Sequence, residues 1–194
     1  MGKGMSVTSM VMWAVAVVAV VYAVLIYNNL VQLKHNVAKA WANIDVLLKQ
    51  RHDELPKLVE TCKQYMAYEQ DTLKQVIDAR AAVFSASESA NVKGLGPAEQ
   101  RLRAGLGKLF ALAENYPALK ADESFRHLQA RISGLEGAIA DRRELYNDSG
   151  NRLGVRIEQF PDVIVARLFG FRPVDLLRFS AEETRDVDIK ALFG

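Results

Sequence analysis

The stretch MVMWAVAVVAVVYAVLI, residues 10–26, consists of apolar side chains alone. Around it, no Lys, Arg, Asp, Glu or His occurs between Met5 and Leu33. A helix that crosses a bilayer needs roughly 20 consecutive, predominantly apolar residues. The stretch therefore predicts a transmembrane anchor over residues 5–33, to which the rest of the chain is attached.

Two other interpretations of this stretch fit less well. A cleavable signal peptide has an apolar region of about 7–15 residues and then small residues at a cleavage site, but bulky Tyr22, Leu25 and Ile26 stand there instead. A buried helix of a soluble protein usually carries a polar stripe, and residues 7–26 show none. We therefore expect an uncleaved anchor.

The residues at the two ends of the anchor predict its boundary and its orientation. Tyr22 and Tyr27 approach the far end, where aromatic rings often lie at the level of the lipid headgroups, so we expect the membrane boundary near residues 27–32. Basic residues near a span favour the cytoplasmic side. Lys3 precedes this span, and four basic residues follow it: Lys34, Lys39, Lys49 and Arg51. We therefore expect the large body of the chain in the cytoplasm.

The remainder of the chain has the composition of one globular domain. The sequence has 194 residues and a net charge of +2, with acidic and basic residues interspersed. Because nucleic-acid-binding proteins usually show a concentrated basic patch, we expect no nucleic-acid partner. The single cysteine, Cys62, cannot form an internal disulfide. Its neighbours Val59 and Met66 at helical spacing predict a buried, unreactive thiol.

Apolar residues at steps of three and four predict helices throughout the body. The first series continues from the anchor without a break: Leu30, Leu33, Val37, Trp41, Ile44 and Leu48. A second series runs from Leu55 to Phe84. We therefore expect an all-α fold, in which the transmembrane helix continues into an antiparallel four-helix bundle with long helices over residues 28–160.

Prolines and small polar residues set the expected boundaries of the first helices. Because Pro56 bends or breaks a helix interior but is tolerated in a first turn, we place a break near Asp53, which would cap the second helix. One long kinked helix is the alternative. The stretch SASESANVKGLG, residues 85–96, predicts a loop before a third helix that opens at Pro97.

The last long helix has the most regular apolar pattern in the chain. A turn over residues 115–121 leads to Asp122, which we expect to be the N-cap. The pattern then keeps its register from Phe125 to Phe160. Residues 161–169 are expected to form one short apolar helix, closed by Gly170.

A long series of residues from the membrane boundary onward follows the pattern of one family. The matching residues are Tyr27-Asn28, Leu30-Val31, Ala40-Trp41, Asn43 to Val46, Leu48-Lys49, Arg51, Asp53, Leu55-Pro56, Leu58 to Glu60, Glu69, Ala79-Arg80, Tyr116-Pro117, Leu119 to Ala121, Glu123, Phe125, Leu128-Gln129, Glu136, Ile139-Ala140, Arg143, Tyr146-Asn147, Ile157, Phe160-Pro161 and Gly170-Phe171. In these residues the chain resembles the LemA family over about residues 27–171. It departs from the pattern at Tyr68, where the family commonly has a histidine, and around Gly150 and Gly154.

The resemblance implies a membrane-anchored, mostly cytoplasmic helical bundle, in a family that includes a protein needed to form magnetosome membranes. It implies no catalytic residues. With the charge pattern, it leads us to expect a single-pass protein of the bacterial inner membrane, with its N-terminus outside.

The residues themselves show little enzyme chemistry. Di-iron sites in bundles need Glu-x-x-His motifs, and the sequence has none. His127 follows Glu123 by four residues, on one helical face, but His35 and His52 lack matching carboxylates, so we interpret all three as surface histidines. P-loops, nucleophile elbows and paired cysteines are also missing from the sequence. We therefore expect no catalytic residue, no cofactor and no metal.

Eight polar residues lie on or beside the apolar seams: Asn43, Asp45, Arg51, Glu69, Arg80, Glu136, Arg143 and Asn147. We favour the interpretation that they pair with one another and determine which helix meets which. A polar groove for a partner is the alternative. Trp41, in phase with Val37 and Ile44, is interpreted as a core anchor.

The C-terminal segment, residues 161–194, is rich in apolar and basic side chains, which the bundle, lipid or another chain must cover. Its candidate interaction or membrane-contact residues are Phe169, Phe171, Arg172, Leu176, Leu177 and Phe179. We therefore favour a membrane scaffold or assembly protein, whose partners are the lipid bilayer and either further copies or other membrane proteins. The alternative is a metal-dependent or enzymatic factor that uses Glu123 and His127.

Overall fold

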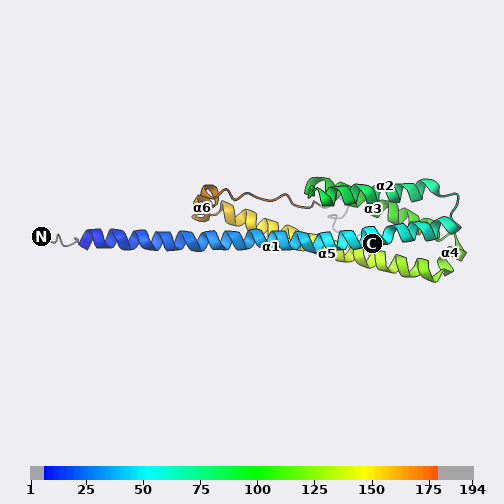
Figure 1. Ribbon diagram of the computed structural model, residues 1–194, viewed down its shortest axis with the longest axis horizontal. Helices are drawn as coiled ribbons and strands as arrows, with labels where there is room; N and C mark the ends of the chain where they lie inside the picture. The colour runs from blue at the N-terminus through cyan, green and yellow to red at the C-terminus, as the bar shows by residue number, and fades with distance from the viewer. Residues whose placement is uncertain (1–6, 179–194) are drawn as a thin grey trace, which may run out of the picture. The chain divides into compact units, whose positions relative to one another are not determined.

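Six helices account for most of the residues that the computed structural model describes, 7–178 (Figure 1). They are α1 (Val7–Tyr65), α2 (Gln70–Glu88), α3 (Val92–Ala113), α4 (Pro117–Ala121), α5 (Glu123–Glu158) and α6 (Asp162–Leu168). No strand occurs within this range. The expected all-α fold, with an apolar N-terminal helix that continues into a bundle, is confirmed.

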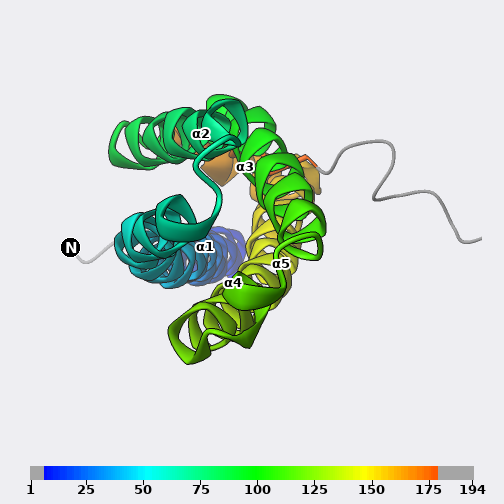
Figure 2. The ribbon, with the colours of Figure 1, turned by 90° about the vertical axis from the view of Figure 1, so that its right-hand side faces the viewer.

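The chain divides into two compact units, each assembled from two stretches. The first unit combines Met1–Ala40 with Asp148–Val174, and the second combines Trp41–Asn147 with Asp175–Gly194. In the second unit, parts of α1 and α5 pack with α2 and α3 as the four long helices of the bundle (Figure 2). Its core consists of aliphatic residues from all four helices, such as Ile44, Val76, Leu106 and Ile132, each fully buried.

The N-terminal part of α1 is left uncovered by the rest of the described chain. Its apolar side chains from Val7 to Leu25 are exposed except for half-buried Ala23, and the first buried residue is Ile26, at 5% exposure. At about 1.5 Å per residue, the segment 7–25 is about 28 Å long, close to the roughly 30 Å hydrocarbon core of a bilayer. Among the described helices, α1 is the one that is long and apolar enough to cross a membrane.

The position of Pro56 had led us to expect a break near Asp53, but helix α1 does not break there. It is one helix of 59 residues that contains Pro56. Because proline has no N–H, the carbonyl of His52, four residues earlier, loses its partner within the helix. Arg80 of α2 replaces that partner, since its Nε donates to the His52 carbonyl at 2.9 Å. The helix therefore tolerates the proline through a contact with a neighbouring helix, and Asp53 caps nothing.

This compensation predicts that Pro56 and Arg80 are energetically coupled. Replacing Arg80 with methionine leaves the His52 carbonyl without a donor, so we expect a loss of about 1–3 kcal/mol of stability. In a Pro56→Ala background the restored N–H satisfies that carbonyl, and Arg80→Met should cost less. A double-mutant cycle, measured by chemical unfolding of the full-length protein in detergent, quantifies the coupling. Equal costs of Arg80→Met in both backgrounds would contradict this account.

The break between the first two bundle helices lies twelve or more residues later than expected, at residues 66–69. The expectation that the apolar series from Leu55 to Phe84 forms a single second helix is therefore wrong. After α1 ends, Met66 remains buried while Tyr68 is 96% exposed. The Glu69 N–H donates to the Met66 carbonyl at 3.1 Å. This turn contains neither glycine nor proline, so the sequence offers no strong local signal for it.

The expected loop at residues 85–96 is much shorter in the structure. Helix α2 continues to Glu88 and α3 begins at Val92, so residues 89–91 make the whole connection. Asn91 caps α3, because its side-chain oxygen accepts from the Gly94 N–H at 3.0 Å. Pro97 consequently lies inside α3 and does not open it.

Asp122 is the N-cap of α5, as expected. Its Oδ1 accepts from the Phe125 N–H at 2.9 Å, and its Oδ2 accepts from the Tyr65 hydroxyl at 3.0 Å. These hydrogen bonds, that of Phe125 foremost, lower the pKa of Asp122 below its ordinary value of 3.8. The cap therefore stabilises the fold above that ordinary pKa and loses its effect as pH falls through the lowered one. The preceding turn, expected over residues 115–121, contains the short helix α4.

Gly170 closes α6, also as expected. Its φ is +70°, a left-handed conformation that glycine adopts without steric cost. The Phe171 N–H donates to the Ala166 carbonyl at 2.9 Å, and the Gly170 N–H donates to the Arg167 carbonyl at 3.4 Å. This pair of hydrogen bonds is the Schellman motif.

Candidate functional site

A buried arginine joins three helices of the bundle. Arg51 on α1 is 1% exposed and pairs with Glu99 on α3, which is 3% exposed. Its other terminal nitrogen lies 3.6 Å from Glu136 on α5. A buried charge needs such partners, because an unpaired ion in the protein interior is costly. Burial raises the pKa of Glu136, and the charge of Arg51 partly opposes that increase.

Other polar residues of the seams also connect helices. Ser87 on α2 donates to Asp45 on α1 at 2.6 Å, and Tyr116 donates to Glu69 at 3.3 Å. Arg143 is 5% exposed. For Asp45, Arg51, Arg80 and Glu136, contacts between helices confirm the interpretation as helix pairing. Asn147 instead bonds the backbone of Leu177, outside the helices. Asn43 is exposed.

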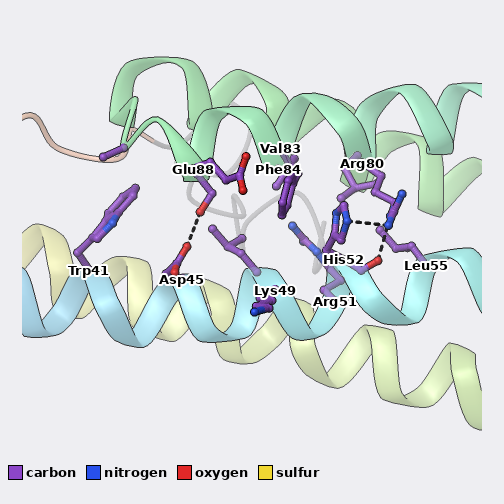
Figure 3. Close-up of a pocket in the computed structure, with 14 residues that line it drawn as sticks. Trp41, Asp45, Lys49, Arg51, His52, Leu55, Arg80, Val83, Phe84 and Glu88 are labelled. Carbon is purple, nitrogen blue, oxygen red and sulfur yellow. Dashed lines mark hydrogen bonds between the residues drawn. The ribbon is translucent and has the colours of Figure 1, made fainter.

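A cavity of about 400 Å³ lies beside these residues, bounded mainly by α1 and α2 (Figure 3). Trp41 lines it near one end and Arg80 near the other. Trp41 is half-buried, and its ring meets that of Tyr146 edge-on at 5.6 Å, so it is only partly the core anchor that we expected. Lys49 and Glu88 add charges to the lining. This cavity is the closest match to the polar groove that was our alternative interpretation of the seam residues.

His52 lines this cavity and is not the surface residue that we expected. Its ring stacks on Phe84 at a centroid distance of 4.3 Å, and its Nε2 lies 2.6 Å from an Arg80 nitrogen. Because arginine only donates, Nε2 must accept and Nδ1 must carry the hydrogen. Burial, and then the charge of Arg80, lowers the pKa of His52. The buried Nδ1 has no hydrogen-bond partner within the described residues.

The residues considered for catalysis or metal binding are not brought together. Glu123, His127 and His35 are exposed, as a surface interpretation predicts for the two histidines. Within residues 7–178, no group of three or more His, Cys, Asp or Glu side chains is placed to hold a metal ion. Cys62 is fully buried, which raises the pKa of its thiol to about 12. The prediction of a buried cysteine is confirmed.

The candidate interaction residues fall into both units. In the first unit, the Tyr27 ring contacts those of Phe169 and Phe171, at centroid distances of 4.7 and 5.9 Å, and Arg172 is exposed. In the second unit, Leu176 is 40% exposed and Leu177 is 1% exposed. Phe179 lies outside the described residues.

An extended segment in the second unit explains why Leu177 is covered. The Asn147 side chain donates to the Leu177 carbonyl and accepts from the Leu177 N–H, both at 2.8 Å. From the neighbouring position on α5, the Tyr146 hydroxyl donates to the Asp175 carbonyl at 2.8 Å. These contacts hold the backbone of residues 175–177 on α5, so Leu177 belongs to the core.

The uncovered apolar helix and the bundle together define a class, that of membrane-associated helical-bundle proteins. The chain belongs to the LemA family, whose model matches residues 40–191. It is also similar to magnetosome proteins. MamQ 1 and MamQ 2 of Paramagnetospirillum magneticum are each 23% identical over 89% of this chain and 72% of their own length. MamQ of Magnetospirillum gryphiswaldense is 22% identical over 90% of this chain and 73% of its own length.

Proposed function

We propose that this protein is a membrane-anchored assembly protein of the bacterial inner membrane. Helix α1 holds the bundle at the cytoplasmic face, where the bundle associates with further copies or with other membrane proteins. The observation that carries the proposal is α1 itself. The same 59-residue helix contains an uncovered apolar segment of bilayer length and the first helix of the bundle.

Two further observations support this function. The similar relatives are named magnetosome proteins, and the family resemblance described above implies a role in forming membranes. The basic residues Lys34 and Lys39, close to the end of the apolar segment, favour a cytoplasmic bundle.

The bundle also presents features to which a partner can bind. In the α1–α2 cavity, the Phe84 ring is 36% exposed. Lys49 and Glu88 form no ion pair within residues 7–178 and remain available to charges on another chain. Partly exposed aromatic rings flanked by charges are typical of protein interfaces.

The mass of the full-length protein in nanodiscs made from its native membrane tests the proposal. We expect a discrete particle that contains several copies, or one copy with a co-purifying membrane protein. A matched chain that ends after Arg178 keeps the Leu177 contacts, so it separates the effect of the C-terminal residues from damage to the core. Particles that contain a single copy and no other protein, for the full-length chain, would contradict the proposed function.

A further inference from the structure

Exposed apolar side chains gather on and around α6 in the first unit. Phe160, Ile164 and Leu168 are 81%, 59% and 77% exposed, and Phe169 is 58% exposed. The spacing of four places Ile164 and Leu168 on one face of the helix. Other residues of α6 are buried: Asp162, Val165 and Ala166. A soluble surface seldom presents so many large apolar groups together.

The first unit itself places this patch at the end of the apolar segment of α1. That segment remains uncovered to Leu25, and Tyr27 follows about 3 Å farther along the helix axis. The rings of Phe169 and Phe171 lie directly against Tyr27. When residues 7–25 occupy the hydrocarbon core, the residues that follow α6 therefore lie where hydrocarbon gives way to headgroups.

The charged residues around α6 also fit a position at the membrane interface. Arg167 and Arg172 are exposed. The acidic residue of α6, Asp162, is 3% exposed and lies 3.3 Å from the Arg156 side chain. Between residues 159 and 174, the exposed charges are consequently all positive. An apolar helix face flanked by arginines is typical of helices that lie in the interfacial layer of anionic membranes.

We propose that α6, with Phe160 and Phe169, lies in the interfacial layer of the same membrane that α1 crosses. Its Ile164–Leu168 face contacts the acyl chains, and Arg167 and Arg172 contact anionic headgroups. The first unit thus touches the bilayer twice, through the spanning segment and through α6. This inference rests on the membrane anchor of the proposed function but not on self-association.

Depth-dependent quenching in nanodiscs tests the proposal on the full-length chain. Cys62→Ala removes the single native thiol, and Leu168→Cys or Ile164→Cys then accepts an environment-sensitive NBD label. The discs contain anionic phospholipid and lipids with a nitroxide near the headgroup. We expect blue-shifted emission that these lipids quench at both positions. Lys108→Cys, an exposed position on α3 in the second unit, serves as the matched control and should emit as in water, without quenching.

Two outcomes would overturn the proposal. Labels on α6 that behave like the Lys108 control would show that the patch faces water. Blue-shifted labels that lipid quenchers do not reach would show that protein covers the patch. Quenched α6 labels on particles that contain one copy and no other protein would overturn the assembly function and leave this inference standing.

Discussion

Replacing Val17 and Val18 with lysine is expected to release the chain from the membrane. Both side chains lie in the uncovered apolar segment and are 58% and 68% exposed. On insertion scales, a lysine near the middle of a span costs about 3 kcal/mol, and a valine contributes slightly in the opposite direction. Two lysines therefore cost about 6 kcal/mol or more, which exceeds what the remaining apolar residues can readily offset. The measurement is the fraction of protein that stays in the membrane pellet after alkaline carbonate extraction.

The matched control replaces the same two valines with leucine and should remain in the pellet. The helical content of the lysine variant, measured by circular dichroism, should stay close to that of the native bundle, since the substitutions touch no core residue. A lysine variant that resists extraction as well as the native chain would show that the segment 7–25 is not what holds this protein in the membrane.

Replacing Arg51 with methionine is expected to remove about 3–5 kcal/mol of stability. The reason is not the value of the ion pair itself, but the carboxylates that the substitution leaves buried without a counter-charge. Because a domain is stable by about 5–15 kcal/mol in total, this variant should unfold at markedly lower temperature and denaturant concentration. Chemical unfolding of the full-length protein in detergent, followed by circular dichroism, measures the loss.

The triple substitution Arg51→Met, Glu99→Met, Glu136→Met is the matched control. It removes the charges together, and replacing a complete buried network with apolar residues is often neutral or stabilising. We expect it to recover most of the stability lost in Arg51→Met. A triple variant as unstable as the single one would contradict the view that stranded carboxylates cause the loss.

The same variant should depend on pH in a defined direction. In the native fold, burial raises the pKa of Glu136 above its ordinary value of 4.5, and Arg51 opposes the increase. Without Arg51 that opposition disappears. A carboxyl with a raised folded-state pKa destabilises the fold above that pKa and is relieved as pH falls toward the ordinary one. The deficit of Arg51→Met should therefore shrink between neutral pH and about pH 5, and a constant deficit would contradict this cause.

The features predicted correctly from the sequence are those determined by local pattern. The long apolar N-terminal helix follows from an uninterrupted apolar run, and the caps at Asp122 and Gly170 follow from residue types that suit those positions. The helix-pairing polar residues were recognisable because they interrupt apolar seams. For the apolar helix and the two caps, the physical cause lies within a few residues of its effect.

The features that the sequence did not reveal depend on contacts between distant residues. Pro56 remains inside α1 because Arg80 satisfies the His52 carbonyl, a contact across 28 positions. The His52 ring lines the α1–α2 cavity through separate contacts, with another Arg80 nitrogen and with the Phe84 ring. A signal was present, since a proline inside a helix leaves the carbonyl four residues earlier without a partner, but the donor could not be identified without the packing of α2. The turn after Tyr65 has no local signal.

The central claim is that α1 crosses the membrane and leaves the bundle in the cytoplasm. Labelling of single cysteines by a membrane-impermeant maleimide tests it most directly, in spheroplasts that express the full chain with Cys62→Ala. We predict that Ser6→Cys reacts in intact spheroplasts and that Lys108→Cys reacts only after lysis. Reaction of both, or of neither, before lysis would contradict the crossing, and the reverse pattern would contradict the cytoplasmic bundle.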